Sequence, residues 1–410
     1  MKRTPLAASF LLRQKGAVMP MVGFIIIVML ALAALAVDIG YILVTKQQLQ
    51  NAADACALAA APALILEEPE KTAEVQSRAT DMASRHRAGN DASVTLDLDK
   101  DIVIQDNRVT VYARKLKERD NGLPLFFARI FGVQYADVFA KATAEMTPSS
   151  LACCVKPWAM PDRWHDEKLI PGYPKWQNNG YWDGEEFTDL DGDGLRGPDE
   201  PFVDSNSDNT YNGEEYDEGF VAENPPAGQI GVEYTLKVNS KNERPSSSFF
   251  NPVVIPWLPE DEVGLPPQGA NRYYESIVGC KSSPISPGER TVIESEPGNM
   301  VGPTDKAVNA IIADDPDAHW DDVVNNVVHD SDGGAVGESP RIVLMPVYDP
   351  RIPPRAGRTT VVITKVVAFF IEDVKSGNIT GRMTRAPSNC PQGSTPGPDP
   401  SFIHSIRLVE

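Results

Sequence analysis

The sequence predicts an α+β protein in which an N-terminal transmembrane helix continues into a stalk. A small α+β domain follows, and then a mostly β domain with a helix-free calcium-binding repeat. Three observations support this prediction. Residues 16–37 contain no charged side chain. Residues 38–61 are rich in Ala, Leu and Gln, which favour helices, and contain no proline. From residue 148 onward, short apolar runs alternate with loops that contain proline and glycine, as is typical of a β-rich domain.

The overall charge excludes one class of partner. The 410 residues include 57 acidic and 38 basic side chains, for a formal net charge of −19. A protein this acidic is repelled by phosphate backbones, so nucleic-acid binding is not expected. The charge is also uneven, because residues 1–16 hold four basic and no acidic side chains, whereas residues 183–218 hold 14 acidic side chains and one arginine. The basic end and the acidic segment are therefore separate clues to function.

The uncharged run over residues 16–37 is long enough to cross a membrane. As a helix, its 22 residues span about 33 Å, against roughly 30 Å for the hydrocarbon core of a bilayer. Because the basic side chains precede the run and Asp38 follows it, the positive-inside rule places the N-terminus in the cytoplasm and the bulk of the chain outside it. The alternative is a cleaved signal peptide, since Ala34-Leu35-Ala36 fits a cleavage site.

These features give the expected domain organisation. Residues 1–16 form a cytoplasmic tail, residues 17–37 the membrane anchor, residues 38–147 the stalk helix and small α+β domain, and residues 148–410 the mostly β domain. The last boundary rests on the Thr-Pro-Ser-Ser run that begins at Thr147, which is typical of a linker.

Hydrophobic periodicity and turn residues predict the individual elements. We expect a second, exposed helix over residues 66–86, and a short helix over Leu125–Phe131 closed by Gly132. Strands are expected over residues 93–98, 101–104, 109–113, 133–145, 232–238, 252–257, 341–348, 359–374, 379–383 and 403–409. Pro256 and Pro346 interrupt two of these runs, which predicts edge or bulged strands there.

The stalk presents one apolar face. The apolar residues at spacings of 3, 4 and 7 are Ile42, Leu49, Ala53 and Cys56. This face either packs on the chain's own folded part or binds a helix of a partner protein. The sequence is compatible with both.

The same region resembles a known family. Gly16-Ala17 precedes the apolar run, Ala36-Val37-Asp38-Ile39-Gly40 ends it, and Lys46-Gln47-Gln48-Leu49-Gln50-Asn51-Ala52-Ala53-Asp54-Ala55 follows. These segments, within residues 13–61, resemble the N-terminal region of the TadG-like proteins of tight-adherence (Flp, type IVb) pilus assembly. The resemblance implies an inner-membrane protein whose large domain lies in the periplasm. It also implies that the stalk binds pilin or pseudopilin helices and other membrane proteins of the assembly system.

The acidic segment contains a calcium-binding pattern. Two loops fifteen residues apart follow the spacing of D-x-D-x-D-G-x5-E and place ligands at Asp189, Asp191, Asp193, Leu195 and Glu200, and at Asp204, Asn206, Asp208, Thr210 and Glu215. Calcium takes six to eight oxygen ligands, which alternate residues of a tight loop can supply. A partial copy precedes them, so the repeat covers residues 179–218. Only three residues separate the two loops, which leaves no room for the helices of an EF-hand pair.

We expect calcium to act as a structural brace. Gly194 or Asn209 is expected to adopt the positive φ of the turn, and Phe187, Phe202 and Tyr216 recur beside the loops. Affinity is expected to be weak, with a Kd of about 0.1–1 mM, as in extracellular modules. The alternative is a solvated acidic loop with no ion.

The cysteine positions predict disulfides. Cys153 and Cys154 are neighbours, so we expect each to reach one of Cys280 and Cys390, in either pairing. Zinc binding is the alternative for these four residues. Cys56 is either a buried small residue of the stalk or an intermolecular bridge.

No catalytic constellation is expected, and neither an enzyme activity nor a small-molecule substrate is predicted. The five histidines stand in no HExxH motif, and no GxSxG, GxGxxG or phosphate-binding loop occurs. His319 and His329 lie near acidic residues, which leaves a periplasmic hydrolase as a third hypothesis. The leading one is a structural role in pilus assembly; the alternative is a calcium-dependent adhesin or cell-envelope binding module that shares the anchor.

Overall fold

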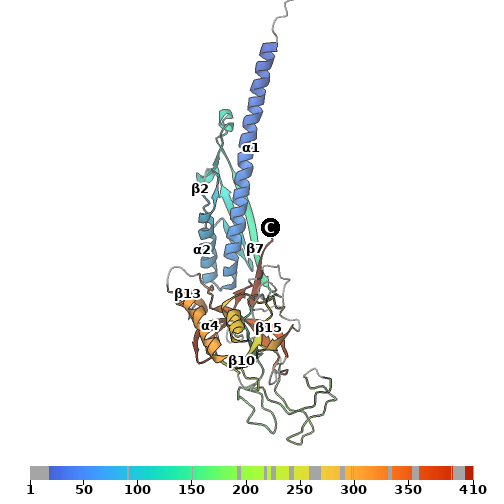
Figure 1. Cartoon of the computed structure of the whole chain (residues 1–410). Helices are drawn as coiled ribbons and strands as arrows, with labels where there is room; N and C mark the ends of the chain where they lie inside the picture. The colour runs from blue at the N-terminus through green and yellow to red at the C-terminus, as the bar shows by residue number, and fades with distance from the viewer. Residues whose placement is uncertain are drawn as a thin grey trace, which may run out of the picture. The chain divides into compact units, whose positions relative to one another are not determined.

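The computed structural model describes most of the chain (Figure 1). The described residues are 18–89, 92–149, 151–191, 195–216, 219–222, 228–239, 244–257, 269–286, 291–296, 298, 300–330, 335–352, 360–388, 390 and 402–409. They form two compact units that alternate along the sequence. The first comprises Met1–Cys56, Thr80–Ile102 and Val111–Ala142, and the second comprises Ala57–Ala79, Val103–Thr110 and Thr143–Glu410.

The first unit contains most of the long helix α1 (Val18–Ala60), drawn in dark blue in Figure 1. This single helix of 43 residues confirms that the apolar segment continues into the stalk. It ends where the 3-10 helix η1 (Ala61–Ile65) begins, because Pro62 lacks the N–H that a helix interior needs but fits a first turn. Side chains between Met19 and Val37 are mostly exposed, whereas those that follow Val44 on one face are buried.

Short elements complete the first unit. Strands β1 (Arg87–Ala88) and β2 (Ala92–Ser93) pair antiparallel, as do β5 (Leu123–Pro124) and β6 (Tyr135–Ala136). Between them lie the 3-10 helices η2 (Lys117–Arg119) and η3 (Ala128–Phe131). Gly132 ends η3 with φ 87°, which confirms the predicted closing glycine. The strand predicted over 93–98 is wrong beyond Ser93, because the Asp97 carboxylate accepts backbone N–H groups of the next turn.

A five-stranded sheet contains the C-terminal strand of the described chain. Its order is β17 (Ala386–Pro387), β18 (Ile403–Leu408), β7 (Val138–Pro148), β4 (Arg108–Lys115) and β3 (Ile102–Gln105). Within the second unit, β18 pairs antiparallel with the end of β7. Glu145 on β7 forms ion pairs with Arg407 of β18 (3.2 Å) and Arg108 of β4 (3.0 Å). Helix α2 (Glu70–Arg85) confirms the second helix that the sequence predicts.

The core of the second unit is a seven-stranded sheet. Its order is β11 (Thr291–Ser295), β10 (Phe249–Val254), β8 (Trp158–Pro161), β14 (Ile342–Tyr348), β15 (Thr360–Lys375), β16 (Asn378–Thr384) and β9 (Glu233–Val238). Additional pairings of β11 with β15 and of β9 with β10 curl the sheet on itself. Apolar side chains of these strands and of helices α3 (Ala270–Val278) and α4 (Val301–Asp314) fill the core. A small hairpin, β12 (Ala318–Asp321) and β13 (Asn326–His329), carries a satellite cluster.

Two features of this unit differ from the sequence-based expectation. Neither strand is at an edge of the sheet: β14 lies between β8 and β15, and β10 lies between β11 and β8 and ends at Val254, before Pro256. Pro346 is instead accommodated by a register shift between Val347 and Tyr348, so the bulge was the correct alternative for β14. The helices α3 and α4 were not predicted, because α3 is short and because Gly302-Pro303 resembles a turn. Pro303 fits in the first turn of α4, where no backbone donor is needed.

Candidate functional site

The first copy of the acidic repeat brings its carboxylates together. Asp189, Asp191 and Glu200 each offer one oxygen, and these atoms lie within 4.8 Å of one another. Leu195 is half-buried in the same loop, and Asp193 lies outside the described residues. Clustered hard oxygen donors of this kind suit a divalent cation such as calcium.

Glu200 is the fixed member of this cluster. Its side chain is buried, with Oε1 accepting the Leu190 N–H at 2.6 Å and Oε2 accepting the Gly197 N–H at 2.7 Å. These bonds tie both arms of the loop to one carboxylate, so the backbone sets the position of Glu200. Asp191, by contrast, is exposed to solvent.

The second copy has the same spacing but a different arrangement. Asp204 accepts the backbone N–H groups of Asp208 (3.1 Å) and Asn209 (2.8 Å), and Asn209 has the predicted positive φ, at 60°. The side-chain amide of Asn206 donates to the Pro171 carbonyl at 2.9 Å. The loop is therefore closed by hydrogen bonds within the protein.

The predicted distal ligand of the second copy points elsewhere. Glu215 forms an ion pair with Lys168, which lowers the pKa of its carboxyl group. Two other predicted ligand residues bond to each other: the backbone N–H of Thr210 donates to the Asp208 carboxylate at 2.8 Å and closes the turn. In the described part of the chain, Asp204, Asp208 and Glu215 do not form a converging ligand group, in contrast to the first copy.

An aromatic cluster packs between the two loops. Phe187 and Phe202 form a β-bridge, and the Tyr211 ring meets both edge-on, with centroids 6.2 Å and 5.7 Å away. The Arg196 guanidinium lies 5.1 Å from the Phe202 ring centre. Two of the three predicted aromatic residues thus pack beside the loops, and Tyr211 takes the third place.

The remaining aromatic residue, Tyr216, is fixed to a different centre. Its hydroxyl donates to the buried Asp162 at 2.8 Å, and burial raises the pKa of the phenol well above its usual range. Asp162 also accepts the Phe220 N–H at 2.7 Å and pairs with Lys365 at 2.9 Å. One buried carboxylate therefore joins the end of the acidic segment to strand β15.

Glu185 plays the same role at the start of the acidic segment, in the partial copy of the repeat. It is buried and accepts the Tyr173 hydroxyl at 2.9 Å, the Ser205 N–H at 2.8 Å and the Asn212 N–H at 3.0 Å. Three separate loops are held by this side chain. This role of Glu185 was not predicted from the sequence.

Glu214 is the most strongly perturbed carboxyl of the segment. It is buried beside two other acids, Asp166 and Asp183, and accepts the Asp183 N–H at 2.8 Å. Burial, aided by these neighbours, raises the pKa of Glu214 to about 8. Burial also raises the pKa of Asp183.

The apolar stalk face is covered by the chain itself. Leu49 is 1% exposed, Ala53 and Cys56 are also buried, and Ile42 is half-buried. Of the two alternatives that the sequence left open, packing on the chain's own fold is the one observed. Another helix could bind this face of α1 only by displacing the chain's own packing.

Asp38 holds a contact that the sequence analysis missed. Its buried carboxylate accepts the backbone N–H groups of Phe126 (2.8 Å), Phe127 (3.0 Å) and Ala128 (2.7 Å). The Tyr41 ring lies 5.2 Å from the Phe126 ring. The available signal was that Asp38 is the first charged residue after the uncharged run.

The four cysteines of the β domain form two disulfides, Cys153–Cys390 and Cys154–Cys280, with Cα–Cα distances of 5.2 Å and 4.5 Å. This resolves the pairing that the sequence left open, and both distances are ordinary for a disulfide. Cys56 is a free, buried cysteine.

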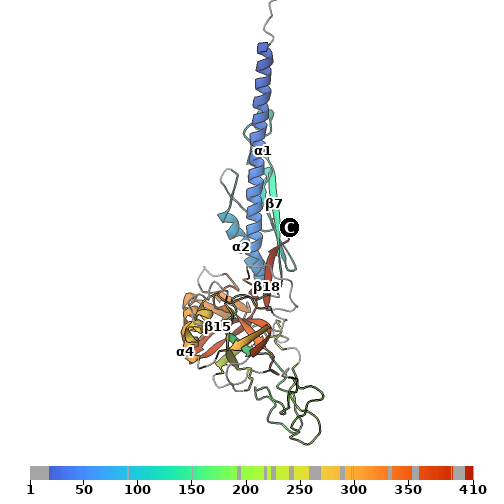
Figure 2. The ribbon, with the colours of Figure 1, turned by 45° about the vertical axis from the view of Figure 1, so that its right-hand side comes forward.

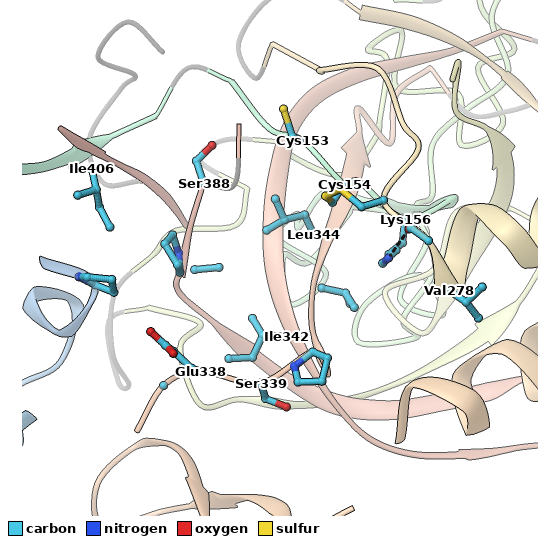
Figure 3. Close-up of a pocket in the computed structure, with 18 residues that line it drawn as sticks. Cys153, Cys154, Lys156, Val278, Glu338, Ser339, Ile342, Leu344, Ser388 and Ile406 are labelled. Atoms are coloured by element: carbon cyan, nitrogen blue, oxygen red, sulfur yellow. Dashed lines mark hydrogen bonds between the residues drawn. A yellow bond between two sulfur atoms is a disulfide. The ribbon is translucent and has the colours of Figure 1, made fainter. Parts of the chain in front are cut away.

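A cavity of about 560 Å³ lies beside these disulfides, and Figure 3 shows its lining. Lys156 is the buried charged group on one side, and donates to the Gly279 carbonyl at 3.1 Å. Burial lowers the pKa of Lys156 to about 8. Glu338 and Ser339 line another part of the cavity, as Figure 3 shows.

Among the residues that the structure describes, neither histidine of the hydrolase hypothesis forms a nucleophile–base pair with a serine. His329 Nε2 lies 3.1 Å from Asp315 Oδ2, and the Ser339 hydroxyl donates to the same carboxylate at 2.5 Å. A catalytic triad needs the serine bonded to the histidine, whereas here both contact the aspartate. His319 is exposed, 3.7 Å from Asp330.

The comparisons with known proteins concern the N-terminal region. Residues 16–63 match the family model described as putative Flp pilus-assembly TadE/G-like. Comparison with curated proteins found no match, and comparison with solved structures found none either. The matched residues contain all of α1, the one helix in the described chain that is long and apolar enough to cross a membrane. The resemblance seen in residues 13–61 is thereby confirmed: residues 16–63 of this chain are similar to the segment that defines the putative Flp pilus-assembly TadE/G-like family.

Proposed function

We propose that this protein is a membrane-anchored component of a tight-adherence (Flp) pilus assembly system, and that it acts through protein–protein contacts. The observation that carries the proposal is the family match over residues 16–63, which coincides with α1. The family segment thus supplies both the apolar helix and the start of the folded part.

The exposure of α1 supports anchoring in a membrane. Nearly every side chain from Met19 to Val37 is exposed, although almost all of these residues are apolar. A surface of this size would be unfavourable in water, whereas a bilayer would cover it. The disulfides Cys153–Cys390 and Cys154–Cys280 fit an oxidising compartment, which supports a periplasmic location for the bulk of the chain.

The exposed side of α1 is the surface that we propose for a partner helix. The exposed residues that follow helical spacing along it are Ile39, Leu43, Gln47, Asn51 and Leu58. We call these five residues the exposed stripe. A pilin or pseudopilin helix, or another membrane protein of the assembly system, would contact the stripe while the opposite face stays packed on the chain's own fold.

Calcium is proposed as a structural brace at the first acidic loop. Asp189, Asp191 and Glu200 would hold the ion, because their oxygens already converge and Glu200 is fixed by two backbone N–H groups. The ion would neutralise part of the negative charge of the segment. It has no catalytic role in this proposal.

The proposal is tested by counting pili on cells that lack this protein, using electron microscopy. We expect loss of pili, restored by the wild-type chain but not by a stripe variant that combines Gln47→Trp with Leu58→Lys. Immunoblotting checks that the variant accumulates. Normal pili in the deletion strain would contradict the proposal, and normal pili with lost surface attachment would favour the adhesin alternative.

A further inference from the structure

The loop between β5 and β6, residues 125–134, is fastened to α1 where the apolar segment ends. Figures 1 and 2 both show this teal loop beside the helix. The fastening is the Asp38 carboxylate, which accepts three consecutive backbone N–H groups at the start of η3. The β5–β6 pairing closes the base of the loop, where the Leu125 N–H donates to the Gln134 carbonyl at 3.0 Å. The loop therefore lies at the same level along α1 as Asp38.

The tip of this loop is apolar and exposed. Half of its ten residues are large apolar side chains on the surface: Phe126, Phe127, Ile130, Phe131 and Val133. Ile130 is 76% exposed and Phe131 is 80% exposed. Outside α1, the other exposed large apolar residues of the described chain stand singly or in small groups, so this loop holds the densest concentration. Isolated exposed apolar residues need no explanation, but a concentration of this kind indicates an interaction surface.

The position of the loop identifies what covers it. Asp38 is the first charged residue after the uncharged run 16–37, so it marks the place where α1 would leave the hydrocarbon core. A loop fixed at that level meets the interfacial region of the same leaflet. Aromatic residues favour this region, and Arg129, the only charged residue of the loop, is exposed and can reach lipid headgroups.

We propose that residues 125–134 form a second membrane contact, in which Phe127, Ile130 and Phe131 insert into the interfacial region of the bilayer from which α1 emerges. The inference rests on the proposed anchoring of α1. A helix alone leaves the folded part free to rotate and tilt about one point. A second contact, rigidly joined to the helix through Asp38, would fix the orientation of the first unit relative to the membrane.

The test is a depth measurement on the purified full-length chain in nanodiscs of phosphatidylethanolamine and phosphatidylglycerol. Single cysteines replace Ile130 in the loop, Leu30 in the apolar segment and Gln47 on α1, in a Cys56→Ala background with the two disulfides intact. Gln47 is exposed and lies about 14 Å beyond Asp38 along the helix, so it serves as the aqueous control. Each cysteine carries an environment-sensitive fluorophore, which is quenched by iodide from water or by phospholipid spin-labelled near the headgroup.

We expect the label at residue 130 to be quenched by the spin-labelled lipid and to be several-fold less sensitive to iodide than the label at residue 47. Equal iodide sensitivity at 130 and 47, with residue 30 shielded, would overturn the loop contact but leave the anchor intact. Iodide access at residue 30 as well would overturn the anchor and the loop contact together. Shielding of residue 130 from both quenchers would mean that protein, not lipid, covers the loop, and would also overturn the proposal.

A second variant tests the fastening. Asp38→Asn removes the negative charge of the carboxylate that accepts the three N–H groups, and leaves the side-chain size nearly unchanged. In this variant we expect iodide sensitivity at residue 130 to rise several-fold, while the label at residue 30 keeps its shielding. An unchanged response at residue 130 would contradict the role of Asp38 in setting the depth of the loop.

Discussion

Helix α1 and the acidic segment over residues 183–216 reach a defined structure by opposite means. In α1, small and apolar side chains such as Leu49, Ala53 and Cys56 pack tightly on one face. The described residues of the acidic segment form few regular elements, and buried carboxylates accept backbone N–H groups from several loops. The first arrangement depends on excluding water from apolar surface, and the second depends on satisfying each buried charge with hydrogen bonds.

Because of this difference, we expect the two regions to respond to different perturbations. Loss of apolar contact should unfold the helical region, whereas charge, pH and divalent cations should act mainly on the acidic segment.

The largest effect is expected on the buried face of α1. Leu49→Lys would place a charge where the side chain is 1% exposed, which should cost about 4 kcal/mol or more and prevent normal folding. Leu58→Lys makes the same substitution at an exposed position of the same helix and should change stability by less than about 0.5 kcal/mol. Thermal unfolding of the purified chain compares them. Equal melting temperatures would show that the face of Leu49 is not packed in solution.

A smaller loss is expected when a carboxylate of the acidic segment is removed. Glu185→Ala leaves two backbone N–H groups and the Tyr173 hydroxyl without their acceptor, at a cost of about 2–3 kcal/mol. Glu186→Ala alters an exposed neighbour and should have little effect. Protease digestion would reveal a loosened segment in the first variant only. Equal digestion of the two variants would contradict the bracing role of Glu185.

Calcium should act through the first acidic loop alone. With a Kd of about 0.1–1 mM, 10 mM calcium should stabilise the chain by about 1–3 kcal/mol and raise Tm by a few degrees. Asp191→Asn should abolish this shift, because Asp191 belongs to the converging cluster. Glu215→Gln should retain it, because Glu215 pairs with Lys168. Identical melting curves for wild type with calcium and with chelator would eliminate the calcium proposal.

The smallest effect is a pH dependence at Glu214. Its pKa is about 8 in the folded chain, above the ordinary value of 4.5, so the folded state retains a proton that the unfolded state releases. The contribution of Glu214 to the free energy of unfolding therefore falls as pH rises from about 4.5 to 8. Glu214→Gln should raise Tm by a few degrees at pH 8 and by less at pH 5. Glu215→Gln, which removes a carboxyl whose pKa is lowered, should not stabilise at pH 8.

The sequence predicts the parts of this structure that depend on periodicity. The length of α1, the helix α2 and most long strands follow from apolar spacing and turn residues, and neighbouring Cys153 and Cys154 limit the disulfide pairings. The burial of Leu49 did not follow, because an apolar helix face looks the same whether its own chain or a partner covers it. The two acidic loops also share one spacing, yet among the described residues the carboxylates converge in the first loop and not in the second. In the second loop Glu215 instead forms an ion pair with Lys168, which is distant in sequence.

The contacts of Asp38 and Glu185 could not be predicted from the sequence for a related reason. Each accepts N–H groups from segments far along the chain, such as Phe126 for Asp38 and Asn212 for Glu185. Nothing local distinguishes such a carboxylate from a solvated one. Its role becomes visible only when the loops that it joins are placed in space.

We propose that the segment similar to TadE/G-like proteins must be held in the membrane for this protein to act in pilus assembly. The most direct test compares pilus counts in a deletion strain that expresses either the wild-type chain or residues 38–410 released into the periplasm by a cleavable signal peptide. Immunoblotting of cell fractions confirms equal amounts and the expected release. We expect pili with the anchored chain and none with the released one. Equal pilus counts would contradict it, because the apolar segment would then serve only for export.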